Sequence, residues 1–403
     1  MLYPILADYF CQHFPEAEIK PLFLKPQPAD KGLDDWDAVL GLAQRKIAGL
    51  EFEPEPQTIY VSHQAGTPAI SSAVQFSSLA KFGDRVRFLV SSELDTRTPE
   101  ILPSSSYLKG IRQQEAMTLL DRHDYSGVEV LVRDYLKGNE ETKTLLNAAI
   151  QWNFAKFDEF ANEIQKLSSP ECQDLIEEVK ERSQQWWWTA YEAAYLAWLR
   201  LDQGNTVDAF FHSFRSIEGA FSNWGKKVFY EYVEIENERA FLQPSILESS
   251  HDYFKGAKFK QDGTPKNSLA KLKQKLLAMA ERIKNVGEKD QRSKGLLLFG
   301  DDLYILFRSQ KPDYEGENFN RFWNSEDGIG EKRNKNFHQL QGLSQEDLLS
   351  DWEVNNPNEW EKQLLTYLNF IAKEDLSKKF EFLEEASLMA KVHQELVSAI
   401  DSL

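Results

Sequence analysis

The string RNKNFH, residues 333 to 338, places an arginine five positions before a histidine, with two asparagine amides between them. Arg333 is permanently cationic and can hold a phosphate, while the imidazole of His338 can transfer a proton near neutral pH. Asn334 adds an amide directly beside the guanidinium. Together these groups could break an RNA phosphodiester without a metal ion. Arg-His spacing alone has low specificity, so the interpretation depends on the elements that position these residues.

A second informative string, TIYVSHQAGTPAISSAVQF, occupies residues 58 to 76. After a strand, Thr67 and Pro68 are expected to open a helix, because Thr is favoured at the N-cap and Pro at the first helical position. Such a helix start offers amides to phosphate at the carboxyl edge of a parallel sheet. We predict a ligand loop at Gly66, Thr67 and Pro68; a capped turn without ligand is the alternative. His63 beside the loop either contacts a nucleotide or is solvated.

The first 137 residues alternate between strand-length apolar runs and helical patterns. Residues 19 to 24, 58 to 62 and 85 to 90 are expected to be strands, and the stretch from 33 to 47 has helical periodicity. This βαβ rhythm predicts a mostly parallel, doubly wound sheet in a Rossmann-like domain. The loop lacks the spacing of a Walker or GxGxxG motif, so ATP hydrolysis and nicotinamide binding are poorly supported.

Residues 138 to 403 show mainly long helical patterns and predict a helical domain. One amphipathic helix is marked by apolar residues at steps of three and four, namely Val207, Phe210, Phe211, Phe214, Ile217, Phe221 and Trp224. The run Trp186, Trp187, Trp188 either stacks bases or packs inside, and packing is favoured because consecutive positions point to different helical faces. Polar, breaker-rich loops are expected at 261 to 268 and 311 to 318.

Composition limits the classes of function. A chain of 403 residues with 41% hydrophobic residues is expected to fold into two domains. Its net charge of -17 does not suit a protein that coats nucleic acid, so any RNA contact must be local. The sequence has no apolar run of the roughly 18 residues needed to span a bilayer, so a cytoplasmic protein is expected. Cys11 and Cys172 form no CxxC or zinc-ligand pattern, and we expect no metal site.

A nucleotide-sensor-like α/β half followed by a helical half with Arg-x4-His resembles the CARF-HEPN ribonucleases of type III CRISPR systems. The resemblance rests on three strings in the same order, at residues 58 to 76, 209 to 221 (AFFHSFRSIEGAF) and 333 to 338. It implies a CARF sensor domain over residues 1 to 137 and a HEPN ribonuclease domain over 138 to 403. One departure concerns the N-terminus, where MLYPILADYFCQHF is expected to be helical and the family's first strand is missing.

The resemblance also implies an activity. In this family the sensor half forms a homodimer and binds cyclic oligoadenylate, and the helical half then cleaves single-stranded RNA in antiviral defence. Carried over, Gly66, Thr67 and Pro68 match the ligand loop. Arg333, Asn334 and His338 match the nuclease motif. No cofactor is implied apart from the cyclic oligoadenylate activator, and no membrane or DNA partner is expected.

Metal-independent cleavage would use the RNA's own 2'-hydroxyl as nucleophile, which predicts a 2',3'-cyclic phosphate and a 5'-hydroxyl and leaves DNA intact. Arg333 would hold the scissile phosphate, and His338 would act as acid or base. The alternative function is a cyclic-nucleotide-binding regulatory protein without nuclease activity, whose Arg-His pair is incidental.

Overall fold

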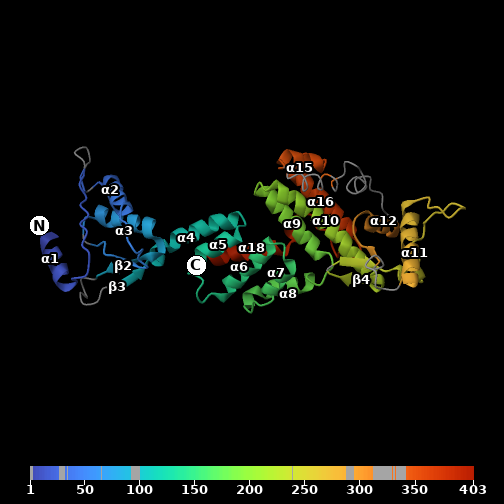
Figure 1. Cartoon of the computed structure of the whole chain (residues 1–403), viewed down its shortest axis with the longest axis horizontal. Coiled ribbons are helices and arrows are strands. Elements are labelled where there is room, and N and C mark those ends of the chain that lie inside the picture. The colour runs from blue at the N-terminus through green and yellow to red at the C-terminus, as the bar shows by residue number, and fades with distance from the viewer. Residues whose placement is uncertain are drawn as a thin grey trace. The chain divides into compact units, whose positions relative to one another are not determined.

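The computed structural model describes residues 3–26, 32–33, 35–64, 66–91, 100–237, 239–286, 295–311, 329, 332 and 342–403. The chain divides into two compact units, Met1–Gln114 and Glu115–Leu403, whose elements are labelled in Figure 1. The elements of the first unit, in chain order, are α1 (Tyr3–His13), α2 (Trp36–Ala48), β1 (Ile59–Val61), α3 (Pro68–Phe82), η1 (Gly83–Arg85), β2 (Val86–Val90), β3 (Glu100–Pro103) and the start of α4 (Ser104–Asp121).

The first unit is built on a three-stranded sheet with the order β1-β2-β3. Strands β1 and β2 pair in parallel, with Val61 beside Phe88, which confirms the strands predicted at 58 to 62 and 85 to 90. Strand β3 was not predicted, and it pairs with β2 in the antiparallel sense, Leu102 opposite Phe88. Among the described strands of the first unit, therefore, one pair is parallel and one is antiparallel. The prediction of a mostly parallel sheet is not met by these strands.

The strand predicted at residues 19 to 24 is wrong, because this segment has no regular secondary structure. Pro21 lacks the N–H that a ladder requires, and the apolar side chains beside it remain exposed, Leu22 by 46% and Phe23 by 53%. A β-rich composition therefore did not produce a strand here. The helix expected at the N-terminus is present as α1.

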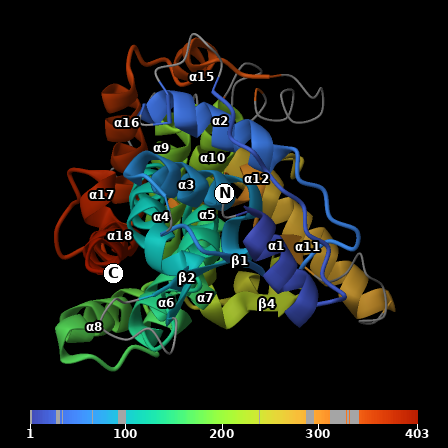
Figure 2. The same ribbon diagram turned by 90° about the vertical axis from the view of Figure 1, so that its left-hand side faces the viewer.

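Helices α2 and α3 lie side by side (Figure 1, Figure 2), and α3 contacts strands β1 and β2 of the sheet. The small side chains of Ala43 on α2 and of Ala69 and Ala73 on α3 are buried between them together with Val39, which allows the helices to approach closely. Asp35 caps α2 by accepting a 3.0 Å hydrogen bond from the amide of Ala38. The packing of α2 against α3 fixes the position of the start of α3, where the predicted ligand loop lies.

The second unit is mainly helical. Its elements are the end of α4, α5 (Tyr125–Val132), α6 (Glu140–Asn153), α7 (Phe157–Ile164), η2 (Pro170–Cys172), α8 (Gln173–Arg182), α9 (Trp188–Asp202), α10 (Thr206–Val228), η3 (Tyr230–Tyr232), β4 (Val233–Glu236), β5 (Arg239–Leu242), η4 (Pro244–Glu248), α11 (Ser268–Val286), β6 (Leu296–Leu297), α12 (Gly300–Gln310), α15 (Gln345–Asp351), α16 (Pro357–Ile371), α17 (Leu383–Ala386) and α18 (Leu388–Asp401).

This unit begins earlier than the change of sequence pattern at residue 137. Leu120, Tyr125 and Val128 are fully buried in the same hydrophobic cluster as the later helices. Burying apolar side chains of this size stabilises a fold by about 1.5–3 kcal/mol each, so the end of α4 and all of α5 belong to the helical core.

The amphipathic pattern predicted around residues 207 to 224 forms α10, which packs along α9. Phe210, Phe221 and Trp224 of α10 are buried, as the spacing predicted, whereas Val207 is 51% exposed. Trp187 and Trp188 are buried in the same core. Trp186 packs against that core and donates a 3.0 Å hydrogen bond to Asp375. These contacts support the packing interpretation of the three tryptophans.

The helical unit also contains a small sheet that the sequence analysis missed. Strands β4 and β5 form an antiparallel pair, and β6 adds two residues on the other side of β5. Strands this short carry too little alternation to be distinguished from loops in a sequence. None of the described helices is both long and apolar enough to cross a membrane.

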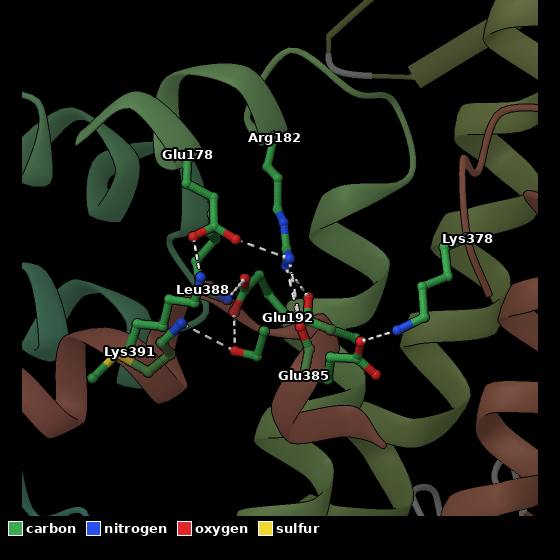
Figure 3. A network of polar contacts seen from close by, with 10 residues as sticks. Glu178, Arg182, Glu192, Lys378, Glu385, Leu388 and Lys391 are labelled. Atoms are coloured by element: carbon green, nitrogen blue, oxygen red, sulfur yellow. Dashed lines mark hydrogen bonds and ion pairs between the residues drawn. The ribbon is translucent and has the colours of Figure 1, made fainter. Parts of the chain in front are cut away.

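A buried carboxyl group anchors the last helix to α9. Glu192 is 1% exposed and accepts hydrogen bonds from Trp152 Nε1 at 2.8 Å, Ser387 Oγ at 2.6 Å and the Leu388 amide at 2.7 Å. Burial raises the pKa of Glu192. Figure 3 shows this group among charged residues that link α8 to the same region, including Arg182, which lies 3.0 Å from Glu178.

Candidate functional site

The predicted ligand loop is the turn between β1 and α3, and the structure brings its three residues together there. Thr67 caps α3, because its Oγ1 accepts a 3.3 Å hydrogen bond from the Ile70 amide and donates one of 3.2 Å to the Leu33 carbonyl. Pro68 is the first helical residue. Gly66 has a φ of +148°, and a Cβ at this position would lie 3.2 Å from Ile70 Cγ2. Only glycine fits this turn without strain.

Some backbone amides at this helix start already donate hydrogen bonds within the protein. The Ser71 amide bonds to the Thr67 carbonyl at 2.9 Å, and the Ile70 amide is held by the threonine side chain. Pro68 has no N–H. In the described part of the chain the amides of Gly66 and Thr67 have no hydrogen-bond acceptor, and Gly66 is exposed. These two amides are therefore the loop's available donors to an anion.

The rim of the sheet beside this loop is lined by neutral polar groups. His63 Nδ1 lies 3.0 Å from Ser71 Oγ, and the imidazole edge contacts the ring of Phe88, with 5.3 Å between centroids. Burial lowers the pKa of His63, so the ring is neutral at pH 7. Gln64 Oε1 accepts hydrogen bonds from the amide of Ser91 at 2.7 Å and from its hydroxyl at 3.2 Å. Gln64 thus ties together the ends of the two parallel strands.

Arg333, Asn334 and His338 lie outside the described residues, so the structure does not place the predicted nuclease motif. Its two flanks are placed. Immediately before the motif, Lys332 forms an ion pair with Asp351 at the end of α15, at 2.9 Å. Beyond it, the Leu343 carbonyl accepts a hydrogen bond from the hydroxyl of Thr206 at the start of α10. Both flanks are therefore attached to helices of the second unit.

The helix that holds the first flank is well fixed. Ser344 and Asp347 form a capping box at the start of α15, each side chain bonding the other residue's amide at 3.1 Å. Leu348 and Leu349 are buried against the core. Ile329, four residues before Arg333, is 6% exposed in the same core. The chain is thus buried at Ile329 and partly exposed at Lys332.

The helix that holds the second flank carries a neutral imidazole. Burial, together with the charge of Arg215, lowers the pKa of His212 on α10 to about 4. Its Nδ1 is buried and has no hydrogen-bond partner in the described part of the chain. Sequence reasoning gave His212 no role, because no motif marks it.

Two further histidines come together from distant parts of the second unit. The rings of His123 and His393 stack with centroids 4.3 Å apart, and His393 Nδ1 lies 3.1 Å from the Tyr125 hydroxyl. Burial is the main cause that lowers the pKa of His123 to about 4. These contacts span 270 positions of sequence, so no local spacing could have shown them. No group of three or more His, Cys, Asp or Glu residues suited to a metal ion occurs among the residues that the structure describes.

The chain was compared with known proteins. No family model and no curated protein matches it in sequence. One solved structure that matches is that of Enterococcus italicus Csm6 bound to cyclic hexa-2'-fluoro-hexa-dAMP, with a TM-score of 0.53 and 14% sequence identity. The match covers 92% of this chain and 81% of that chain. The chain has the fold of Csm6.

Csm6 is a CARF-HEPN accessory ribonuclease of type III CRISPR systems, so the fold predicted from the sequence resemblance is confirmed. An α/β unit followed by a helical unit fits the CARF plus helical HEPN architecture that the sequence resemblance predicted. Because the match covers most of the chain, the likeness extends over both units.

Proposed function

We propose that this protein is a type III CRISPR accessory endoribonuclease, activated by cyclic oligoadenylate and acting in antiviral defence. The observation that carries the proposal is the Csm6 fold over 92% of the chain, combined with the Arg333-x4-His338 motif in the helical half. Fold alone does not define an activity. The motif supplies residue types that can perform the chemistry.

The proposed reaction is transesterification of RNA without a metal ion. The 2'-oxygen attacks the adjacent phosphorus, its proton passes to a base, and the 5'-oxygen leaves with a proton from an acid. Arg333 stabilises the negative charge that builds on the phosphate oxygens, with Asn334 beside it, and His338 transfers one of the protons. The products are a 2',3'-cyclic phosphate and a 5'-hydroxyl.

The proposed activator site is the β1–α3 turn. The solved Csm6 structure holds a cyclic hexanucleotide analogue, which supports a ring of linked adenylates as the ligand here. The amides of Gly66 and Thr67 would donate to a phosphate of the ring, and Pro68 fixes the helix start that presents them. A homodimer would place two such turns, and two Arg-His pairs, on either side of one symmetry axis.

The test is to incubate the purified protein with labelled single-stranded RNA in EDTA, alone and with cyclic tetra- or hexa-adenylate. The proposal predicts cleavage that one of the rings stimulates, with cyclic-phosphate ends and no cleavage of DNA. Binding of a ring measured by calorimetry, together with uncleaved RNA under every condition, would instead establish a regulatory protein without nuclease activity.

A further inference from the structure

A strongly basic segment stands out against the acidic composition of the chain. The protein has a net charge of -17, yet residues 255 to 275 contain seven lysines and a single acidic residue, Asp262. Six of these lysines are exposed. The lysines are Lys255, Lys258, Lys260, Lys266, Lys271, Lys273 and Lys275. Positive charge is therefore gathered on one short stretch of the helical unit.

Part of this segment, residues 258 to 266, forms a small antiparallel hairpin. The Lys266 amide bonds to the Lys258 carbonyl at 2.7 Å, and the Lys260 amide bonds to the Thr264 carbonyl at 2.8 Å. Asp262 fixes the turn by accepting from the Thr264 amide at 2.9 Å. In Figure 1 this segment, coloured yellow, projects from one end of helix α11. The hairpin is an ordered element rather than a loose loop.

Hairpin pairing places three of the lysines on one face. The bridge between Phe259 and Pro265 sets the register, so that Lys258 lies opposite Lys266. Side chains two positions apart in a strand point to the same face, which adds Lys260 to this pair. None of the three forms an ion pair in the part of the chain that the structure describes. Like charges directly opposite one another destabilise a hairpin, so folding alone gives no reason for this arrangement.

The hairpin is joined to a cavity of about 560 Å³ between the start of α11 and α12. The cavity's lining includes the cations Lys255 and Arg308, one carboxylate, Asp301, and the polar side chains of Asn267, Ser268 and Tyr304. Asn267 connects the two features, because its side chain accepts from the Lys258 amide at 3.2 Å and donates to the Gly256 carbonyl at 2.9 Å. A cavity of this size is in the range of ligand pockets and can admit a nucleotide.

We propose that the lysine face of the hairpin and the adjoining cavity form a binding surface for the backbone of single-stranded RNA. This inference rests on the proposed function and adds to it the surface that recruits the substrate. Each lysine would neutralise one phosphate and release its counterions. A nucleotide-sized cavity lined by two cations and one carboxylate favours RNA over an acidic protein as the ligand, because an acidic peptide needs no such cavity. The acidic remainder of the protein keeps this contact local.

The experiment uses the full-length protein and single-stranded RNA with 2'-O-methyl groups, which lacks the nucleophile and stays intact. The test variant is Lys258→Gln/Lys260→Gln/Lys266→Gln. The matched control, Lys156→Gln/Lys180→Gln/Lys362→Gln, removes the same charge from exposed sites elsewhere in the helical unit. Affinity is measured by fluorescence anisotropy between about 50 and 200 mM salt. Polyglutamate serves as the competing acidic polymer.

The hairpin variant should bind RNA about tenfold more weakly. Its slope of log affinity against log salt should fall by about 2, because each single-strand phosphate contact contributes about 0.7. The control should bind like the unmodified protein. Equal binding by the hairpin variant, no binding by the unmodified protein, or equal affinity for polyglutamate would each overturn the inference. A failure of the proposed function has a different signature, because unmodified RNA would then stay intact while the lysine-dependent binding persists.

Discussion

Lys332 Nζ and Asp351 Oδ1 lie 2.9 Å apart, and Lys332 directly precedes the arginine of the predicted nuclease motif. The two side chains are 30% and 19% exposed. An ion pair at this level of exposure stabilises a protein by about 0–1 kcal/mol, so its main effect is on position rather than stability. It fixes the chain one residue before Arg333, which holds the scissile phosphate in the proposed reaction.

Asp351→Asn should therefore lower kcat with little change in KM, because the arginine would be held less well in the transition state. A loss of about 1 kcal/mol corresponds to roughly a fivefold decrease. The exchange Lys332→Asp/Asp351→Lys should restore part of the rate. Glu163→Gln, which breaks the Lys166–Glu163 pair elsewhere in the unit, is the control. An unchanged kcat in Asp351→Asn would remove this positioning role.

Gly66→Ala tests the ligand loop. With φ at +148° and Ile70 close to the new Cβ, the backbone must shift, at a cost of about 1–3 kcal/mol. Calorimetry should then show weaker binding of cyclic oligoadenylate, and RNA cleavage should lose its stimulation. Gly83→Ala is the matched control, because Gly83 also has a positive φ but lies at the other end of α3. If both variants bind the ring like the unmodified protein, the ligand lies elsewhere.

The local elements of this protein were largely predictable, because they depend on neighbouring residues. The Thr67-Pro68 helix start and the 3.6-residue period of α10 follow from short-range chemistry and were confirmed. The segment at 19 to 24 was mispredicted because a strand exists only where another strand pairs with it. Strand β3 was missed for the same reason, since its pairing depends on a return of the chain that no spacing encodes.

The candidate site could be proposed from the sequence only where its residues are adjacent. Gly66, Thr67 and Pro68 are neighbours, and the structure places them in one turn. Asp351, which forms an ion pair with Lys332, lies 19 positions further along the chain. The hairpin lysines share one face only because of the register between the two hairpin strands. Such relationships arise from the fold rather than from a motif.

Glu192→Ala should strongly destabilise the second unit. The substitution leaves the donors of Trp152, Ser387 and Leu388 buried without an acceptor, at a cost of about 1–3 kcal/mol for each group that water cannot reach. Urea unfolding measures the loss, and Glu192→Gln, which keeps an acceptor, should lose less. Equal stability of the alanine variant and the unmodified protein would contradict this role.

The pH dependence of Glu192 has a defined sign. Burial raises its pKa in the folded state above the ordinary 4.5, so the folded protein binds the proton more readily than the unfolded chain. Its contribution to the unfolding free energy therefore decreases as pH rises from 4.5 through the raised pKa. Glu192→Gln should lack this decrease, and unfolding measured across that range tests it.

The buried His123 predicts a pH dependence of the opposite sign. Burial lowers the pKa of His123 to about 4 from the ordinary 6.5, so the unfolded chain binds more protons between these values. The unfolding free energy should fall as pH decreases from 6.5 to 4. His123→Phe keeps an aromatic ring against His393 and should show a weaker fall. An identical pH profile in both proteins would assign the dependence to other groups.

The central claim is that one guanidinium and one imidazole perform RNA cleavage, and single-turnover rates of the Arg333→Ala and His338→Ala proteins test it most directly. Both rates, measured with saturating ring activator in EDTA, should fall by at least about a hundredfold, in line with the loss of a general acid or base. Thermal unfolding and ring binding should stay unchanged. Cleavage by either correctly folded variant at the rate of the unmodified protein would contradict the account.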